Sequence, residues 1–208
     1  QLLLLSKTSA YFRIRVPFEN AWMEKFTSVN PRMRVVDTTR GISERRLNDP
    51  HIWLAPALVK VQARTICKAL SALDPSSGKF YEQNLARFEE KLSTLSKKIR
   101  TLFRDLKRRT IVVYHPCWGY FAQEFGLKQI AVQHEGKSPG ASALAGLITA
   151  ARKVHARCIF AQPQFDTRSA RILAGQIGGK VVLIDPLAEA WERNLLDVAG
   201  RMAACLGK

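Results

Sequence analysis

Hydrophobic residues in the second half of the chain form short runs that alternate with helical patterns. The clearest runs are Ile111–Tyr114 and Lys180–Ile184, whose apolar residues predict strands buried on both faces. Weaker runs and helical stretches complete the alternation: strands at 129–132 and 157–161, and helices at 119–125, 142–153, 167–176 and 188–206. Repeated strand–helix–strand units predict a parallel sheet with helices on its faces.

The first part of the chain has shorter patterns. Strand-like segments lie at 11–14 and 33–36, a short helix with an aromatic face lies at 18–26, and Pro56 opens a longer helix. The cluster D-P-S-S-G at 74–78 is dense in residues that break helices and strands. We therefore expect a first lobe over residues 1–77.

The most regular hydrophobic pattern follows this cluster. Apolar residues alternate at spacings of four and three in one stripe: Tyr81, Leu85, Phe88, Leu92, Leu95, Ile99, Leu102 and Leu106. The stripe predicts a continuous helix over residues 78–107, which at ~1.5 Å per residue would be roughly 45 Å long. A coiled coil has similar spacing. The position between two strand-rich halves favours a spine that joins the first lobe to a second lobe over residues 108–208.

The composition is that of a globular chain with a strongly basic balance. Of 208 residues, 47% are hydrophobic, and 33 Lys and Arg against 17 Asp and Glu give a formal charge of +16. Such a charge favours anionic partners, but the basic residues are scattered, so we interpret them mainly as solvated faces and expect no nucleic acid. No apolar stretch reaches the length of a membrane span. The chain starts without Met or a signal-peptide pattern, and we expect a processed or truncated product.

Two histidines and one carboxylate lie at the ends of predicted elements. His115 follows the first clear strand, Asp185 follows the last one, and His51 lies in a turn ahead of a helix. Because open parallel sheets bind ligands beyond the carboxyl ends of their strands, these residues predict a divalent metal site, for Zn²⁺ on chemical grounds with Mn²⁺ and Fe²⁺ open. Each has a plainer interpretation: a polar strand end for His115, a helix N-cap for Asp185 and a turn residue for His51.

The remaining reactive side chains give weaker signals. His155 fits a solvated position, and His134 ranks below the three candidate ligands. The four cysteines lack the C-x-x-C spacing of a zinc ribbon, and Cys117 fits a small buried residue better than a soft ligand. No nucleophile–base pair stands out. A metal-dependent hydrolase is an alternative function that would need Glu135 as its general base, and a basic nucleic-acid-binding domain is a third.

Five short motifs are spread from residue 49 to residue 187. They are D-P-H-I-W-L at 49–54, Y-H-P-C-W-G-Y-F at 114–121, E-G-K-S-P at 135–139, F-A-Q-P-Q-F at 160–165 and I-D-P-L at 184–187. In this order, the motifs resemble those of the metal-binding solute receptors of bacterial ABC-type zinc and manganese importers. Each motif alone is weak, whereas the five together are specific.

The resemblance implies an α/β receptor of two lobes, each a parallel sheet flanked by helices, joined by one long rigid helix. It implies a metal ion between the lobes, bound by His51 from the first lobe and by His115 and Asp185 from the second. Zinc is the expected ion, and manganese is the alternative. The receptor would be a monomer without enzymatic activity, in the periplasm or at the extracytoplasmic face of the cell membrane. It would deliver its metal to a membrane permease.

The resemblance also implies a disulfide and an incomplete first lobe. Zinc receptors of this family can carry a disulfide between the positions of Cys158 and Cys205, which implies an oxidising compartment and leaves Cys67 and Cys117 unpaired. Family members begin with a further strand and a loop that carries another histidine ligand. Neither is found ahead of Phe18 here, so we expect an N-terminal truncation and an incomplete site. The His- and acid-rich loop of many zinc members is also absent.

Overall fold

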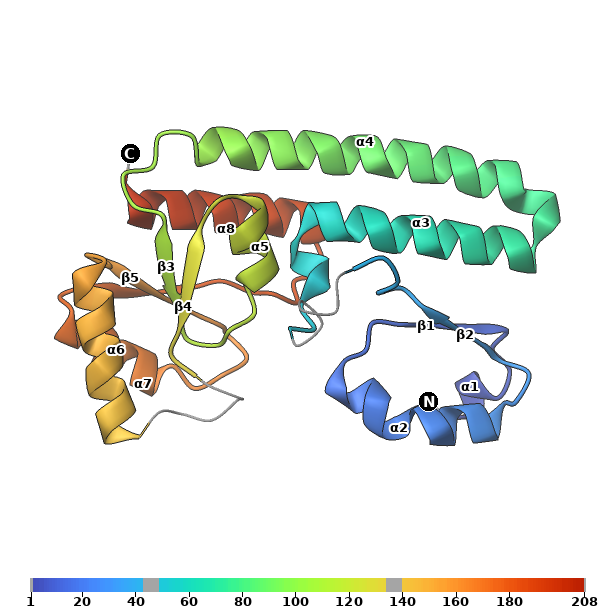
Figure 1. The fold of residues 1–208 in the computed structure, drawn as a ribbon, viewed down its shortest axis with the longest axis horizontal. Coiled ribbons are helices and arrows are strands. Elements are labelled where there is room, and N and C mark those ends of the chain that lie inside the picture. The colour runs from blue at the N-terminus through green and yellow to red at the C-terminus, as the bar shows by residue number, and fades with distance from the viewer. Residues whose placement is uncertain (1, 43–48, 134–139, 208) are drawn as a thin grey trace. The chain divides into compact units, whose positions relative to one another are not determined.

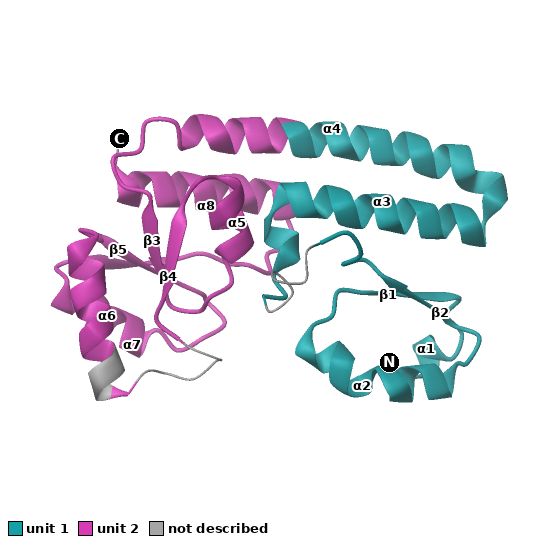
Figure 2. Cartoon of the chain, viewed as in Figure 1, with its two compact units in different colours: residues 1–93 teal, residues 94–208 magenta. Residues whose placement is uncertain are grey.

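The chain forms two compact units in a computed structural model that describes residues 2–42, 49–133 and 140–207. Unit 1 comprises residues 1–93 and unit 2 comprises residues 94–208 (Figure 2). The boundary lies inside helix α4 (Gly78–Leu102), which contributes residues to both units. None of the described helices is long and apolar enough to cross a membrane.

Unit 2 contains a parallel sheet with the strand order β4-β3-β5-β6 (Figure 1). The strands are β3 (Thr110–Val113), β4 (Lys128–Ala131), β5 (Cys158–Ala161) and β6 (Lys180–Leu183). The central strands β3 and β5 are the buried ones, as continuous apolar sequences require. The sheet confirms the predicted parallel α/β architecture. The chain adds β4 on one side of β3 and then β5 and β6 on the other, so the strand order reverses between β3 and β5.

Helices pack on this sheet and complete the core of unit 2. They are α5 (Gly119–Glu124), α6 (Ala141–Lys153), α7 (Arg168–Gln176) and α8 (Trp191–Leu206). Leu173 of α7 packs in one cluster with Val112 of β3 and Ile159 of β5, and all three side chains are at most 1% exposed. α8 buries an apolar face that includes Leu195 and Met202. Burial of these faces against the sheet is the main source of stability for such a layered unit.

Helix α4 ends at Leu102, short of residue 107 where the hydrophobic stripe predicted its end. The stripe itself is confirmed, because residues such as Ile99 are fully buried. The chain turns after α4, and the Arg109 guanidinium donates hydrogen bonds to the carbonyls of Phe103 (3.0 Å) and Arg104 (3.3 Å). These bonds satisfy carbonyls that a longer helix would have paired internally. The function of α4 as a rigid connection between two lobes stays a prediction.

Unit 1 contains a smaller parallel sheet of two strands. β1 (Ala10–Arg13) pairs with β2 (Arg34–Asp37), and helix α2 (Pro17–Val29) connects them. The other elements of unit 1 are α1 (Leu2–Leu5), the 3₁₀ helices η2 (Ile52–Leu54) and η3 (Pro75–Ser77), α3 (Pro56–Leu73) and the first part of α4.

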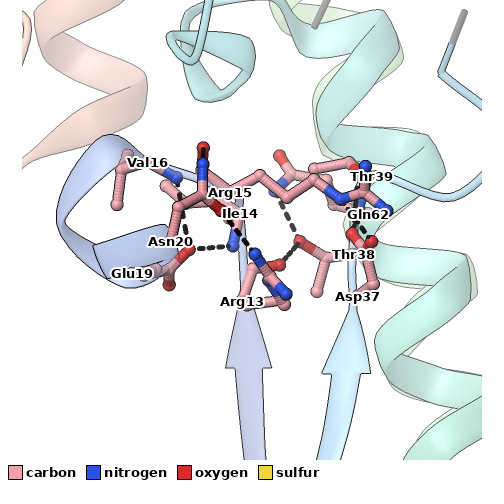
Figure 3. Close-up of polar contacts among 10 residues, drawn as sticks. All are labelled: Arg13, Ile14, Arg15, Val16, Glu19, Asn20, Asp37, Thr38, Thr39 and Gln62. Carbon is pink, nitrogen blue, oxygen red and sulfur yellow. Dashed lines mark hydrogen bonds and ion pairs between the residues drawn. The ribbon is translucent and has the colours of Figure 1, made fainter. Parts of the chain in front are cut away.

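Buried polar contacts fix the carboxyl ends of these two strands (Figure 3). The Glu19 carboxylate of α2 is 5% exposed and accepts the backbone N–H of Ile14 (2.9 Å), which ties α2 to the end of β1. The Thr38 hydroxyl donates to the Arg13 carbonyl (2.9 Å) and accepts from the Gln62 side-chain amide of α3 (3.2 Å). These bonds join β1, β2 and α3 at the edge from which the chain leads to His51.

Candidate metal centre

His115 lies just beyond β3, at the carboxyl edge of the unit 2 sheet. The Tyr114 N–H donates to the Phe160 carbonyl of β5 (2.7 Å), so the pairing with β5 continues to the residue before His115. This is the place where the strand order reverses, and open parallel sheets bind ligands there. The imidazole is partly buried, and its centroid lies 5.5 Å from that of the Phe165 ring. His115 therefore has the strand-end position that its sequence predicted.

The side chain of Gln133 orients the imidazole of His115. Its Oε1 lies 3.2 Å from Nδ1 of His115, and Gln133 is 9% exposed. The parallel register produces this pair, because Val113 lies opposite Ala131 and the Gln133 N–H donates to the Tyr114 carbonyl (2.8 Å). Since an amide oxygen accepts hydrogen bonds, this contact favours the tautomer in which Nδ1 carries the ring proton and donates it. Nε2 is then the nitrogen suited to bind a cation.

Asp185 lies at the same edge, in the segment that follows β6. Its Oδ1 accepts hydrogen bonds from Gln164 Nε2 (2.6 Å) and from the Leu187 N–H (2.8 Å), and its carbonyl accepts from the Asn194 side chain of α8 (2.7 Å). The bond to Leu187 closes a turn, whereas α8 begins later with Ala190 as its N-cap residue. The interpretation of Asp185 as the N-cap of the last helix is therefore wrong. Both side-chain bonds use Oδ1, and Oδ2 is the other oxygen that the carboxylate offers.

Strand β5 separates His115 from Asp185 within unit 2. Neighbouring strands lie ~4.8 Å apart, so the ends of β3 and β6 are roughly 10 Å apart. The segment after β5 lies between them, since Gln164 bonds to Asp185 and the Phe165 ring packs near His115. The F-A-Q-P-Q-F motif thus supports both candidate ligands of this unit.

His51 lies in unit 1, directly ahead of η2. Its Nδ1 is 2.6 Å from Oδ1 of Asp49, which also accepts the backbone N–H of His51 (3.0 Å). The side chains of Ile52 and Leu54 are fully buried and anchor the turn. A carboxylate bonded to one imidazole nitrogen fixes the ring and directs Nε2 to a cation, as it does behind many metal-bound histidines. This bonding gives His51 a more defined orientation than a plain turn residue requires.

A disulfide joins Cys158 at the start of β5 to Cys205 near the end of α8. The two Cα atoms lie 5.9 Å apart across a sequence separation of 47 residues. This pairing confirms the bond that the family resemblance implied. Cys67 and Cys117 are buried thiols outside it.

The sequence model of one protein family, described as the periplasmic zinc-uptake complex component A (ZnuA), matches residues 1–200. The chain belongs to this family. The ZnuA of Bacillus subtilis (strain 168) is 30% identical over 141 residues, which make up 67% of this chain and 44% of that protein. The ZnuA of Brucella suis biovar 1 (strain 1330) is 28% identical over 170 residues, or 77% of this chain and 51% of that protein. The chain thus spans about half the length of the curated relatives it matches.

Solved structures show the ZnuA fold for the whole chain. A crystal structure of ZnuA matches with a TM-score of 0.94 at 40% identity and covers 100% of this chain and 83% of that chain. A zinc-bound ZnuA deletion mutant matches with a TM-score of 0.92, also at 40% identity, over 100% of this chain and 82% of that chain. The laminin-binding protein Lbp of Streptococcus pyogenes shares the fold, with a TM-score of 0.87 at 22% identity over 99% of this chain and 84% of that chain.

The predicted ligands of this ZnuA-family chain belong to different units, with His51 in unit 1 and both His115 and Asp185 in unit 2. Within the described part of the chain, no group of three or more His, Cys, Asp or Glu side chains is close enough to hold a metal ion. The three-residue ligand set therefore stays a prediction. Sequence reasoning missed Asp49 and Gln133. The D-x-H spacing was a usable signal for Asp49, whereas only the strand register identifies Gln133.

Two of the lesser candidates, Cys117 and His155, have the plainer roles that the sequence favoured. Cys117 is fully buried, and its Sγ lies 2.7 Å from Nε2 of Gln162, which fits a small core residue. His155 is exposed just after α6. His134, the E-G-K-S-P motif and the hydrolase candidate Glu135 lie outside the described residues.

Proposed function

We propose that this chain is part of an extracytoplasmic receptor that binds one divalent transition metal, zinc in the first place, and delivers it to the permease of an ABC importer. The observation that carries the proposal is the His115–Gln133 pair at the carboxyl edge of a parallel sheet, in a chain whose residues 1–200 match the zinc-uptake family. The receptor acts in the periplasm or at the extracytoplasmic face of the membrane, as a monomer.

We assign His51, His115 and Asp185 as the protein ligands of one ion. The two imidazoles have Nδ1 bonded to Asp49 and Gln133 respectively, so each binds through Nε2. Asp185 supplies a carboxylate. Two neutral imidazoles and one carboxylate suit Zn²⁺, which prefers nitrogen ligands more strongly than Mn²⁺ does. Manganese is the second metal that this set accepts.

The site supports a receptor better than it supports a hydrolase. A receptor needs ligands held in a fixed orientation, and the hydrogen bonds to His51 and His115 provide this. A hydrolase needs in addition a general base near the activated water. The residue that the sequence offers for this base, Glu135, lies outside the described residues. We therefore propose binding and delivery without chemical conversion.

The assignment is tested by calorimetric zinc titration of the chain and of His51→Ala, His115→Ala and Asp185→Ala. We expect each substitution to weaken binding by at least roughly tenfold, since loss of even a supporting group behind a ligand costs ~10- to 100-fold. The matched control is His155→Ala, which removes an exposed imidazole of the same unit as His115 and should leave the affinity unchanged. Unchanged affinity in both His115→Ala and Asp185→Ala would contradict the ligand assignment.

A further inference from the structure

The amino ends of the four strands in unit 2 begin with basic residues. Lys128 and Lys180 are the first residues of β4 and β6, Arg157 precedes β5, and Arg109 precedes β3. The Lys128 N–H donates to the Arg109 carbonyl (2.7 Å), and the Lys180 N–H donates to the Arg157 carbonyl (3.0 Å). Because all four strands are parallel, these residues lie side by side at one edge of the sheet.

Segments that flank the sheet add cations to the same edge. Helix α6 runs opposite to the strands (Figure 1), so its last turn, with Arg152 and Lys153, lies near their starts. The stretch that leads from α4 into β3 adds Arg104 and Lys107. We call the exposed members of this set the basic edge: Arg104, Lys107, Arg109, Lys128, Arg152, Lys153, Arg157 and Lys180.

None of the ion pairs between described side chains involves a residue of the basic edge. In the stretch between α4 and β3 the acidic residue is Asp105, which is exposed. Glu124 at the end of α5 is half-buried and accepts the Ser96 hydroxyl (3.1 Å). A helix C-terminus favours cations and accounts for Arg152 and Lys153 in part. The helix dipole does not account for the basic residue at the start of each strand, so these four cations need a separate physical explanation.

The opposite edge of the same sheet carries His115 and Asp185. The exposed large apolar residues described in unit 2 lie on α7 or at that opposite edge: Phe165, Ile172, Leu183 and Leu187. Among the described residues, none of them belongs to the segments that form the basic edge. Protein interfaces rely on buried apolar and aromatic anchors, and single-stranded nucleic acid binds by stacking on aromatic rings. The basic edge offers dispersed charge without such anchors.

We propose that the basic edge binds an anionic lipid surface. Four strands at ~4.8 Å spacing make the edge roughly 14 Å wide, and the starts of neighbouring strands lie within the Debye length of about 8 Å at physiological salt, so their cations act together on a charged surface. Each Lys or Arg close to an anionic bilayer strengthens partitioning by roughly fivefold, and mobile side chains suit a surface whose charges are also mobile. Binding by this edge holds the sheet with its amino end toward the lipid, so the receptor has to leave the lipid before the edge with His115 and Asp185 can meet the permease.

The test is co-sedimentation of the full 208-residue chain with vesicles at about 0.15 M salt, with phosphatidylglycerol–phosphatidylcholine vesicles compared with pure phosphatidylcholine. The edge variant carries four substitutions: Lys107→Gln, Lys128→Gln, Lys153→Gln and Lys180→Gln. The control variant makes the same charge change at exposed lysines of unit 1: Lys7→Gln, Lys68→Gln, Lys79→Gln and Lys91→Gln. Circular dichroism verifies that both variants fold.

We expect the chain to bind the phosphatidylglycerol vesicles and not the neutral ones, with binding that weakens as salt rises. The edge variant should bind at least tenfold more weakly than the control variant. Equal losses in the two variants, or wild-type binding to neutral vesicles of equal strength, would overturn the proposal. So would tighter binding to a DNA duplex at the same salt. The measurement is made in chelator, and zinc affinity of the edge variant is measured separately, so failure of this inference is distinct from failure of the metal site.

Discussion

The disulfide between Cys158 and Cys205 yields the most quantitative prediction for unit 2. It closes a loop across 47 residues that contains α7, β6 and most of α8. In the chain-entropy treatment, a crosslink over a loop of this length destabilises the unfolded state by about 4 kcal/mol. Since both cysteines are buried, replacing them would also change packing. Reduction of the bond leaves both sulfur atoms in place and isolates the effect of the crosslink.

The assay is urea unfolding of the oxidised and the reduced chain, with hydrogen exchange at the amides of β5 and α8 as the probe of unit 2. With a urea slope of ~2 kcal/mol/M for a unit of this size, a loss of ~4 kcal/mol lowers the midpoint of unit 2 by about 2 M. The control is the double variant Cys158→Ala, Cys205→Ala, whose stability should not respond to reductant. A midpoint that shifts by less than roughly 0.3 M on reduction would refute the reasoning, because closing the loop would then add no measurable stability to unit 2.

Three further predictions concern single contacts. Gln133→Leu should weaken zinc binding by roughly tenfold and shift the ¹⁵N resonances of His115 away from the Nδ1–H tautomer in metal-free protein, while Gln133→Glu, which retains an acceptor, should preserve both. Hydrogen bonds from the hydroxyls of Ser76, Ser77 and Tyr81 lower the pKa of Asp74 to about 2. The contribution of Asp74 to stability should therefore be complete above pH ~4 and be lost as the pH falls through 2. NMR titration measures this pKa, and a carboxyl that titrates near 4 would contradict the prediction. Burial, and next the hydrogen bond to Glu19, raise the pKa of Tyr11 to about 12. Absorbance titration should therefore find a late tyrosine step that Glu19→Gln moves to lower pH, and the stabilising effect of Tyr11 should be lost as the pH rises through 12.

The parallel sheet and the strand-end position of His115 could be predicted because their signals are local. The apolar run ahead of His115 identifies a buried strand, and the position that follows such a strand is the carboxyl edge of the sheet. Asp185 was found for the same reason. Its interpretation as a helix N-cap was wrong, because Asp185 instead closes a turn with Leu187 and α8 begins at Trp191.

Contacts that depend on strand register could not be predicted from the sequence. Gln133 is 18 residues away from His115 and becomes its neighbour only because β3 and β4 pair in parallel with a particular register. The basic edge has the same origin, since Lys128, Arg157 and Lys180 look scattered along the chain and become neighbours only in the sheet. The disulfide was expected from the family resemblance, because four cysteines alone allow several pairings.

The end of α4 is another feature that the sequence pattern did not predict. The apolar stripe continues past Leu102, and periodicity alone therefore predicts a longer helix. Beyond Leu102, the carbonyls of Phe103 and Arg104 accept hydrogen bonds from the Arg109 guanidinium, an arrangement that requires the chain to turn toward β3. The hydrophobic pattern thus identified the helix, while the turn at its end is marked by contacts of Arg109, which lies just ahead of β3.

X-ray absorption spectroscopy of the zinc-loaded chain tests the central claim most directly, because it reports the atoms bound to the ion. We predict light-atom ligands at about 2.0–2.1 Å with the multiple-scattering signature of two imidazoles, reduced to one imidazole in His115→Ala. A sulfur shell near about 2.3 Å, or a spectrum that His115→Ala leaves unchanged, would contradict a metal centre built on His51, His115 and Asp185.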